Sequence, residues 1–236
     1  MNIAIITAGG RGERMGNRIP KQFVEVNGKK IILFTLEVFE THPQIDAIII
    51  VCLKEWINDV RQLVKHYYIN KVVSIVEGGT EGQQSIYNGL CEAERLYPAD
   101  SIVLIHDSVR PMIDQELISQ NIVEVERNGN SITVVPSVET FIVEEKETKK
   151  MIKREDVHVV RAPQCFRLND ILSLHRQAIA DGKSQYRDCC SMLCDYDIPF
   201  HETIGPSTNI KITFPSDILM FRSLIQLRET QQMLGM

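Results

Sequence analysis

Short apolar runs alternate with longer amphipathic stretches through the first half of the chain. Four runs rich in isoleucine and valine predict buried strands at residues 3–7, 47–52, 72–77 and 102–106. Between them, apolar residues at three- and four-residue spacing predict helices at residues 31–41, 55–67 and 83–96. This alternation is typical of an α/β fold with a Rossmann-like, mostly parallel sheet flanked by helices. Ligands of such sheets bind beyond the carboxyl ends of the strands, and we expect the functional residues there.

The second half of the chain is less regular and includes a segment that we expect to project from the body. The remaining predicted elements are helices at residues 114–128, 168–181 and 188–195, strands at 131–136 and 209–213, and a final helix opened by Pro215. Residues 140–160 alternate polar and apolar side chains around a charge cluster at 144–150, which predicts a solvent-exposed β-hairpin arm. We expect a single domain over residues 1–236, with the arm at about residues 138–160.

Composition and charge exclude several classes of protein. Of the 236 residues, 44% are hydrophobic and 24% are charged, which is typical of a globular chain that buries a core without disulfides. The net charge of −5 lacks the basic footprint of proteins that bind nucleic-acid backbones, so we expect no nucleic-acid partner. Apolar runs such as residues 3–6 and 48–51 are far shorter than the roughly 20 residues of a membrane span. With no signal-peptide pattern and six irregularly spaced cysteines, we expect no membrane partner, a cytoplasmic location and reduced thiols.

The loop directly after the first predicted strand, at residues 7–22, carries the strongest chemical signal. Its glycines let backbone N–H groups approach a phosphate closely. It also contains four cations, which in an acidic protein indicate an anionic ligand: Arg11, Arg14, Arg18 and Lys21. No Gly-Lys-Ser/Thr triplet closes the loop, which excludes a Walker A site. A dinucleotide fingerprint would need a third glycine at Met15 and an acid where Lys54 stands, so we favour a phosphate-binding loop of another kind.

Five motifs, in order along the chain, carry a resemblance to a known family. They are Gly-x-Gly-x-Arg-Met followed by Pro-Lys at residues 10–21, Gly78-Gly79 with Ser85, His-Asp-Ser-Val-Arg-Pro at 106–111, Ala-Pro-Gln-Cys-Phe at 162–166 and Asn-Ile-Lys-Ile-Thr at 209–213. From residue 3 to about residue 227 the chain resembles the cytidylyltransferases that act on 2-C-methyl-D-erythritol 4-phosphate or ribitol 5-phosphate. The reaction this implies is attack by a substrate phosphate oxygen on the α-phosphorus of CTP, with release of pyrophosphate.

The resemblance also implies roles for individual residues. The catalytic residues would be Arg14, Lys21, Asp107 and Lys211. The cations would stabilise charge on the reacting phosphates, and Asp107 would help to hold Mg²⁺, which binds through one or two carboxylates and substrate phosphates. The CTP-binding residues would be Ala8, Gly9, Gly10, Gly12, Gly79, Thr80, Ser85 and Ser108. Asp107 as a structural turn residue and Arg110 as merely a local ion-pair partner remain alternatives, and we expect His106 to be a packed or turn histidine.

The acceptor site departs from the family pattern. Arg154 matches the family's arginine for the acceptor phosphate, whereas Ala162 and Arg187 stand where threonines are expected. Gly82 stands where the family frequently has an arginine near the nucleotide. We assign Arg154, Arg187 and Ala162 to the acceptor site. Losing a hydroxyl partner strongly changes the discrimination between acceptors, so the sequence leaves the identity of the acceptor open. The Asp-Ser-Val-Arg-Pro motif slightly favours an acceptor of the ribitol type.

The predicted arm points to a homodimer. It has little apolar surface of its own, and isolated two-stranded hairpins are marginally stable in water. The resembling family forms homodimers by arm exchange, which implies that Arg154 serves the neighbour's pocket. The leading hypothesis is therefore a homodimeric, Mg²⁺-dependent cytidylyltransferase with CTP and a polyol phosphate as substrates. Two alternatives are an NAD(P)-binding dehydrogenase and a catalytically silent nucleotide-binding relative.

Overall fold

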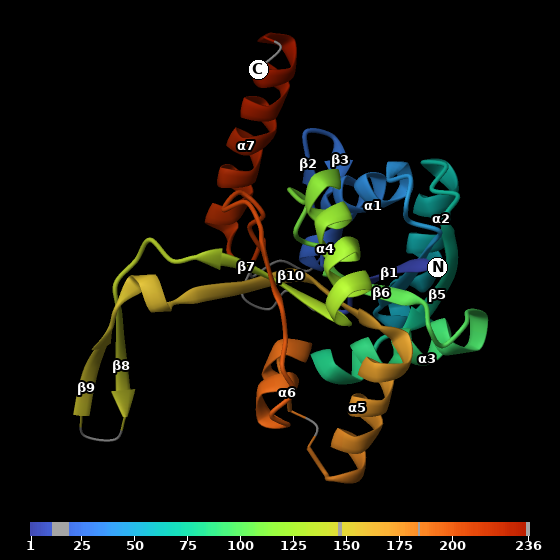
Figure 1. Cartoon of the computed structure of the whole chain (residues 1–236). Coiled ribbons are helices and arrows are strands. Elements are labelled where there is room, and N and C mark those ends of the chain that lie inside the picture. The colour runs from blue at the N-terminus through green and yellow to red at the C-terminus, as the bar shows by residue number, and fades with distance from the viewer. Residues whose placement is uncertain (11–18, 146–147, 184, 235–236) are drawn as a thin grey trace.

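The computed structural model describes residues 1–10, 19–145, 148–183 and 185–234. A seven-stranded sheet in the order β11-β7-β10-β6-β1-β4-β5 runs through the body (Figure 1). Its strands are β1 (Asn2–Ala8), β4 (Ala47–Cys52), β5 (Val72–Glu77), β6 (Ile102–Asp107), β7 (Asn130–Pro136), β10 (His158–Arg167) and β11 (Glu202–Ile204). Only β10 runs against its neighbours in this sheet, and the other neighbouring pairs are parallel. The mostly parallel sheet expected from the sequence is confirmed.

Helices cover both faces of the sheet. They are α1 (Ile31–Thr41), α2 (Ile57–His66), α3 (Gly82–Leu96), α4 (Gln115–Asn128), α5 (Leu168–Ala180), α6 (Cys189–Asp195) and α7 (Pro215–Leu234). One hydrophobic cluster joins α1, α2 and α4 to one face, and a second joins α3, α5 and α6 to the other. None of the described helices is long and apolar enough to cross a membrane. All six cysteines are free.

The central strands have nearly continuous apolar runs because both of their faces are buried. Along β1, Ala4 and Ile6 belong to the cluster under α1, while Ile3 and Ile5 belong to the cluster under α3. Successive side chains of a strand point to opposite faces, so a strand packed on both sides reads as a continuous apolar run. This is why the bounds of β4, which is buried at every position, agree with those predicted from the sequence.

Gly89 marks the place where α3 approaches the sheet most closely. A Cβ atom at this position would lie 2.6 Å from Cγ2 of Ile5 and 2.9 Å from Cγ2 of Val51. We expect Gly89→Ala to lower the free energy of unfolding by about 1–3 kcal/mol, the usual effect of overpacking a core. Urea denaturation measures this change. A gain in stability, the normal result of replacing glycine by alanine in an exposed helix, would contradict the close packing.

The predicted strand at residues 209–213 is wrong. The segment is a loop in which the backbone N–H of Ile212 donates to the carbonyl of Val109, and it forms no strand ladder. Ile210 and Ile212 gave the sequence its strand-like alternation, but in the structure Asn209 and Ile212 are the buried residues of this segment, three positions apart. The Asn209 amide donates to the carbonyl of Ala162 at 2.7 Å, and the Arg110 guanidinium donates to the carbonyl of Asn209 at 3.1 Å. The three-residue strand β11 was not predicted, because it is too short to show a period.

The hairpin predicted between residues 140 and 160 is present and projects from the body (Figure 1). It consists of β8 (Phe141–Glu145) and β9 (Thr148–Ile152), which pair only with each other in the described structure. Residues 158–160 belong instead to β10, where they pair with β7 in the central sheet, so the arm ends earlier than predicted. Ile142 and Met151 lie opposite each other on the hairpin, 64% and 68% exposed. The arm thus presents apolar surface that its own chain leaves uncovered.

Candidate active site

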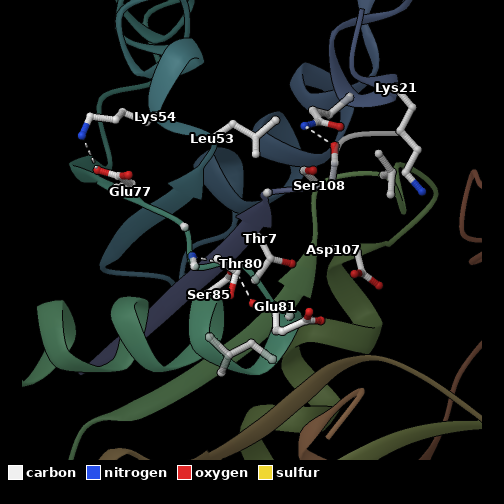
Figure 2. A pocket seen from close by; sticks show the side chains of 18 of the residues that line it. Thr7, Lys21, Leu53, Lys54, Glu77, Thr80, Glu81, Ser85, Asp107 and Ser108 are labelled. Carbon is white, nitrogen blue, oxygen red and sulfur yellow. Dashed lines mark hydrogen bonds and ion pairs between the residues drawn. The ribbon is translucent and has the colours of Figure 1, made fainter. Parts of the chain in front are cut away.

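A cavity of about 890 Å³ lies at the carboxyl ends of β1, β4, β5 and β6 (Figure 2). Its size falls within the roughly 300–1,000 Å³ range of small-molecule sites. The lining residues that follow these strands are Gly9 and Gly10 after β1, Leu53, Lys54 and Glu55 after β4, Gly78 to Gly82 after β5, and Ser108 and Val109 after β6. The cavity therefore lies at the edge of the sheet where the sequence predicts it.

The structure brings most of the residues assigned from the sequence to this cavity. Those that line it are Gly9, Gly10, Lys21, Gly79, Thr80, Ser85, Asp107, Ser108, Arg187 and Lys211. Gly12 and Arg14 fall outside the described residues. Ala8, Ala162 and Arg154 do not line the cavity: the first two are buried in strands, and Arg154 is on the arm. The acceptor residues assigned from the sequence are thus not gathered within one chain.

Gln22 joins the end of the glycine loop to its start. Its side chain is 1% exposed, and its Nε2 atom donates to the carbonyl of Ala8 at 2.6 Å and to that of Gly10 at 3.2 Å. These bonds occupy two carbonyl groups of the loop. Gln22 was not among the residues predicted from the sequence, although it directly follows Lys21 at the end of a loop that must close.

Lys21 enters the cavity from a firmly anchored turn. It opens the 3₁₀ helix η2 (Lys21–Phe23), and its side chain is almost completely buried. Phe23 at the end of this turn stacks on Trp56 with 4.4 Å between ring centroids. Trp56 belongs to the 3₁₀ helix η3 (Lys54–Trp56), whose Lys54 and Glu55 also line the cavity. In Figure 2, Lys21 and Asp107 stand at one end of the cavity, and Lys54 and Glu77 stand at the other.

Asp107 forms an ion-pair network with two cations at the end of β6. Its Oδ1 accepts from the Lys211 ammonium and its Oδ2 accepts from Nε of Arg110, each at 2.9 Å. Burial alone would raise the pKa of the Asp107 carboxyl, but the charges of Lys211 and Arg110 outweigh it and hold that pKa well below its ordinary value. Asp107 is therefore a carboxylate at neutral pH and fixes the Lys211 ammonium at the cavity wall. The ion-pair alternative for Arg110 is confirmed.

The residues around Asp107 fit Mg²⁺ only as an ion with a single carboxylate ligand from the protein. The described residues contain no cluster of three or more histidine, cysteine, aspartate or glutamate side chains that could hold a metal ion. A single carboxylate, however, suits an ion that takes its other ligands from substrate phosphates and water. Each Asp107 oxygen forms one hydrogen bond to a cation and retains a lone pair for such an ion.

The turn between β5 and α3 is held by its own side chains. The Ser85 hydroxyl accepts from the N–H of Gly79 at 3.0 Å and donates to the carbonyl of Glu81 at 3.1 Å. The N–H of Thr80 donates to Oε1 of Gln84 at 3.0 Å. A Cβ atom on Gly79 would lie 2.3 Å from Cγ of Gln84, so this position accepts only glycine without rearrangement. Ser85 thus shapes the wall of the cavity.

His106 takes no part in the cavity. It is 1% exposed, packs beside Phe39, and has Nε2 at 3.2 Å from the carbonyl of Arg110. Burial lowers the pKa of His106 to about 4, so the ring is neutral at pH 7. The expectation of a packed histidine is confirmed.

Comparisons with known proteins agree with this arrangement. Residues 2–226 match the family model of IspD, 2-C-methyl-D-erythritol 4-phosphate cytidylyltransferase. A ribitol-5-phosphate cytidylyltransferase of Vibrio parahaemolyticus is 44% identical over the full length of both chains. A 2-C-methyl-D-erythritol 4-phosphate cytidylyltransferase of Clostridium botulinum is 36% identical, with 95% of this chain and 97% of that protein covered.

A solved structure extends the comparison to the fold. The crystal structure of 4-diphosphocytidyl-2C-methyl-D-erythritol synthase from Anaerococcus prevotii matches with a TM-score of 0.83 and 27% identity, covering 96% of this chain and 98% of that one. These findings give no support to the dehydrogenase alternative.

Proposed function

Because the chain belongs to the 2-C-methyl-D-erythritol 4-phosphate cytidylyltransferase family and is thus a nucleotidyltransferase, we propose that it transfers CMP from CTP to ribitol 5-phosphate. The products are CDP-ribitol and pyrophosphate. One observation carries the choice of acceptor. Relatives named as ribitol-5-phosphate cytidylyltransferases reach 44% and 41% identity over the whole chain, against 36% over 95% of it for a relative named for 2-C-methyl-D-erythritol 4-phosphate.

In the proposed reaction, a phosphate oxygen of ribitol 5-phosphate forms a bond to the α-phosphorus of CTP. The bond from that phosphorus to the bridging oxygen breaks, and pyrophosphate leaves with the electron pair. The protein forms no covalent bond, so its contribution is alignment and neutralisation of charge. Lys21 lies between the glycine loop and the cavity and stabilises the triphosphate. Lys211, held by Asp107 at 2.9 Å, supplies positive charge to the reacting phosphates.

Asp107 is the residue that would hold Mg²⁺ in this reaction. When bound, the ion would neutralise charge across the triphosphate oxygens. Apart from that, Asp107 keeps the Lys211 ammonium in place, because its carboxylate stays ionised beside two cations.

Completion of the site by a second copy of the chain is part of the proposal. Arg154 lies in the 3₁₀ helix η4 (Arg154–Asp156) of the arm, with a side chain that is 61% exposed and paired only with the adjacent Glu155 among the described residues. A salt bridge this exposed contributes little to stability, so the guanidinium is available to another anion. The exposed Ile142 and Met151 on the same arm gain cover in a dimer. We place Arg154 in the partner's acceptor site.

Arg187 is the cavity residue on which we expect acceptor affinity to depend within one chain. Replacing it by threonine should raise the KM for ribitol 5-phosphate about tenfold, since a hydrogen bond to a charged group contributes roughly 1.5–3 kcal/mol. The KM for CTP should change less than about twofold. Steady-state kinetics with each substrate varied in turn measures both values. Equal increases in the two KM values would remove Arg187 from the acceptor site.

Pyrophosphate release from CTP tests the proposed function directly. The panel of acceptors is ribitol 5-phosphate, 2-C-methyl-D-erythritol 4-phosphate, xylitol 5-phosphate, arabinitol 5-phosphate and glycerol 3-phosphate. We expect the highest kcat/KM with ribitol 5-phosphate. A higher value with 2-C-methyl-D-erythritol 4-phosphate would overturn the acceptor but not the transferase. CTP binding is followed separately by the fluorescence of Trp56, the single tryptophan, which lies beside the cavity. CTP binding without pyrophosphate release from any acceptor would contradict the activity.

A further inference from the structure

The connection between α5 and α6, of which residues 181–183 and 185–188 are described, carries Arg187 to the cavity. The Arg187 guanidinium makes no ion pair with a carboxylate in the described part of the chain, whereas Lys54 and Lys211, which also line the cavity, are paired. An arginine at the end of a connecting segment has a long side chain with several freely rotating bonds. Its use in binding therefore depends on what fixes the backbone that carries it.

One buried side chain on α3 fixes that backbone. Gln83 is 4% exposed and lies in the first turn of the helix. Its Nε2 donates to the carbonyl of Lys183 at 3.3 Å, and its Oε1 accepts from the N–H of Tyr186 at 3.2 Å. The Gln83 side-chain amide thus pairs with one backbone carbonyl and one backbone N–H of the connecting segment. Gln83 is about one hundred residues away from this segment in the sequence, so the two hydrogen bonds form only when the chain is folded.

The same segment lies directly against the start of α3. A Cβ atom on Gly82 would lie 4.0 Å from the carbonyl oxygen of Arg187. Gly82 and the preceding Thr80 line the cavity beside Arg187. The turn after β5 and the segment that carries Arg187 therefore form one continuous wall, and Gln83 is the side chain that joins them.

The segment is also held by the Lys183 N–H, which donates to the carbonyl of Ala178 at 2.8 Å, by packing of Tyr186 on a hydrophobic cluster, and by polar side chains that are exposed. The Lys183 ammonium pairs with Oδ2 of Asp195 at 2.6 Å, and the Tyr186 hydroxyl donates to the same carboxylate oxygen. Both side chains of the ion pair are 45% exposed. Exposed ion pairs of this kind hold a segment weakly, because water screens the charges and the long side chains lose entropy. The two hydrogen bonds of Gln83 are part-buried and come from a side chain that is itself 4% exposed, so water competes with them less than with a fully exposed ion pair.

We infer that Gln83 is a positioning residue that sets affinity for the polyol phosphate by holding Arg187 in place. This rests on the proposed function, because it assumes that Arg187 meets the acceptor. Gln83 itself points into the connecting segment and touches neither substrate. Its effect on the reaction passes through the backbone of Lys183 and Tyr186.

The test is a double-mutant cycle in the full-length protein. Gln83→Met keeps the volume of the side chain and removes both hydrogen bonds. We expect it to raise the KM for ribitol 5-phosphate about tenfold and to leave the KM for CTP within about twofold. In the Arg187→Thr background the same change should raise the acceptor KM less than about twofold, because the residue that it positions is already gone. Fully additive effects, or equal changes for both substrates, would overturn the inference.

Gln84→Met is the matched control. Gln84 is the neighbouring glutamine of the same helix turn, but its amide oxygen accepts from Thr80 in the turn after β5 and not from the segment that carries Arg187. We expect Gln84→Met to leave the acceptor KM within about twofold. If Gln83→Met does not fold, Gln83→Glu replaces it, since a carboxylate still accepts from Tyr186 but cannot donate to Lys183. An acceptor KM unchanged by Gln83→Glu would count against the inference.

A second measurement is independent of catalysis. Limited trypsin digestion after Lys183 and Arg187, followed by mass spectrometry, reports how firmly the segment is held. Cleavage there should be about tenfold faster in Gln83→Met than in the wild type or in Gln84→Met. Unchanged cleavage would overturn the positioning role. Faster cleavage in a protein that releases no pyrophosphate with any acceptor would leave that role standing and count against the proposed function instead.

Discussion

Lys21→Ala should lower kcat for pyrophosphate release by about 10²–10³, the effect of removing a donor to charge that develops in a transition state. Lys21 is almost completely buried at one end of the cavity, where water cannot replace an ammonium group efficiently. Its turn is anchored by the Phe23–Trp56 stack, so the substitution should leave the fold intact. The measurement is kcat at saturating CTP and ribitol 5-phosphate, with Trp56 fluorescence and the thermal unfolding midpoint as checks of folding.

Lys54→Ala provides the comparison. Lys54 also lines the cavity, but its side chain is 76% exposed and pairs with Glu77 at 3.5 Å at the opposite end. We expect its replacement to change kcat less than about threefold, since an exposed ion pair contributes little. Near-normal kcat in Lys21→Ala, or an equal loss in both variants, would remove Lys21 from the reacting centre.

Mixing two inactive variants should restore about a quarter of wild-type activity if Arg154 serves the partner's site. The variants are Lys21→Ala and Arg154→Ala. After co-expression at equal levels, about half of the dimers are mixed, and one of the two sites in each has both residues intact. That site combines Lys21 of one chain with Arg154 of its partner. Pyrophosphate release from the purified mixture, compared with the separate variants, gives the result.

The same experiment distinguishes the alternative in which Arg154 acts within its own chain. Every site in the mixture would then lack one of the two residues, and no activity would return. Lys153→Ala is the matched control on the arm, since Lys153 is the exposed neighbour of Arg154. It should retain activity and form a dimer of normal size on gel filtration. A monomeric wild-type protein with full activity would exclude a site shared between chains.

The chemistry of the cavity could be predicted from the sequence to a large extent. Glycines and cations after a first buried strand indicated a phosphate site, and the order of β strands and helices placed it at one edge of the sheet. Lys21, Asp107, Lys211 and Ser85 all line the cavity found there. The family resemblance assigned these residues; the common edge of the parallel strands accounts for Asp107 and the glycine loop, while Ser85 lies in α3 and Lys211 in a loop.

Contacts between distant side chains could not be predicted in this way. The role of Ser85 in shaping the turn, the closure of the glycine loop by Gln22 and the attachment of residues 183–186 to Gln83 all depend on the orientation of a single polar group. A glutamine in a helix turn looks the same in sequence whether it faces water or a buried backbone. Gln83 and Gln84 are adjacent, yet only Gln83 reaches the segment that carries Arg187.

The sequence by itself determined the α/β class, the bounds of the central strands, the projecting hairpin and the family. The first three follow from a local period or from a run of residue types, which neighbouring residues encode directly, and the family follows from the resemblance of motifs in order along the chain. Only the tertiary structure decided that residues 209–213 form a loop, that Arg110 and Lys211 share Asp107, and that Arg154 lies away from its own chain's cavity. These outcomes depend on which segments meet after folding, because burial and charge at a site are supplied by residues from several elements together.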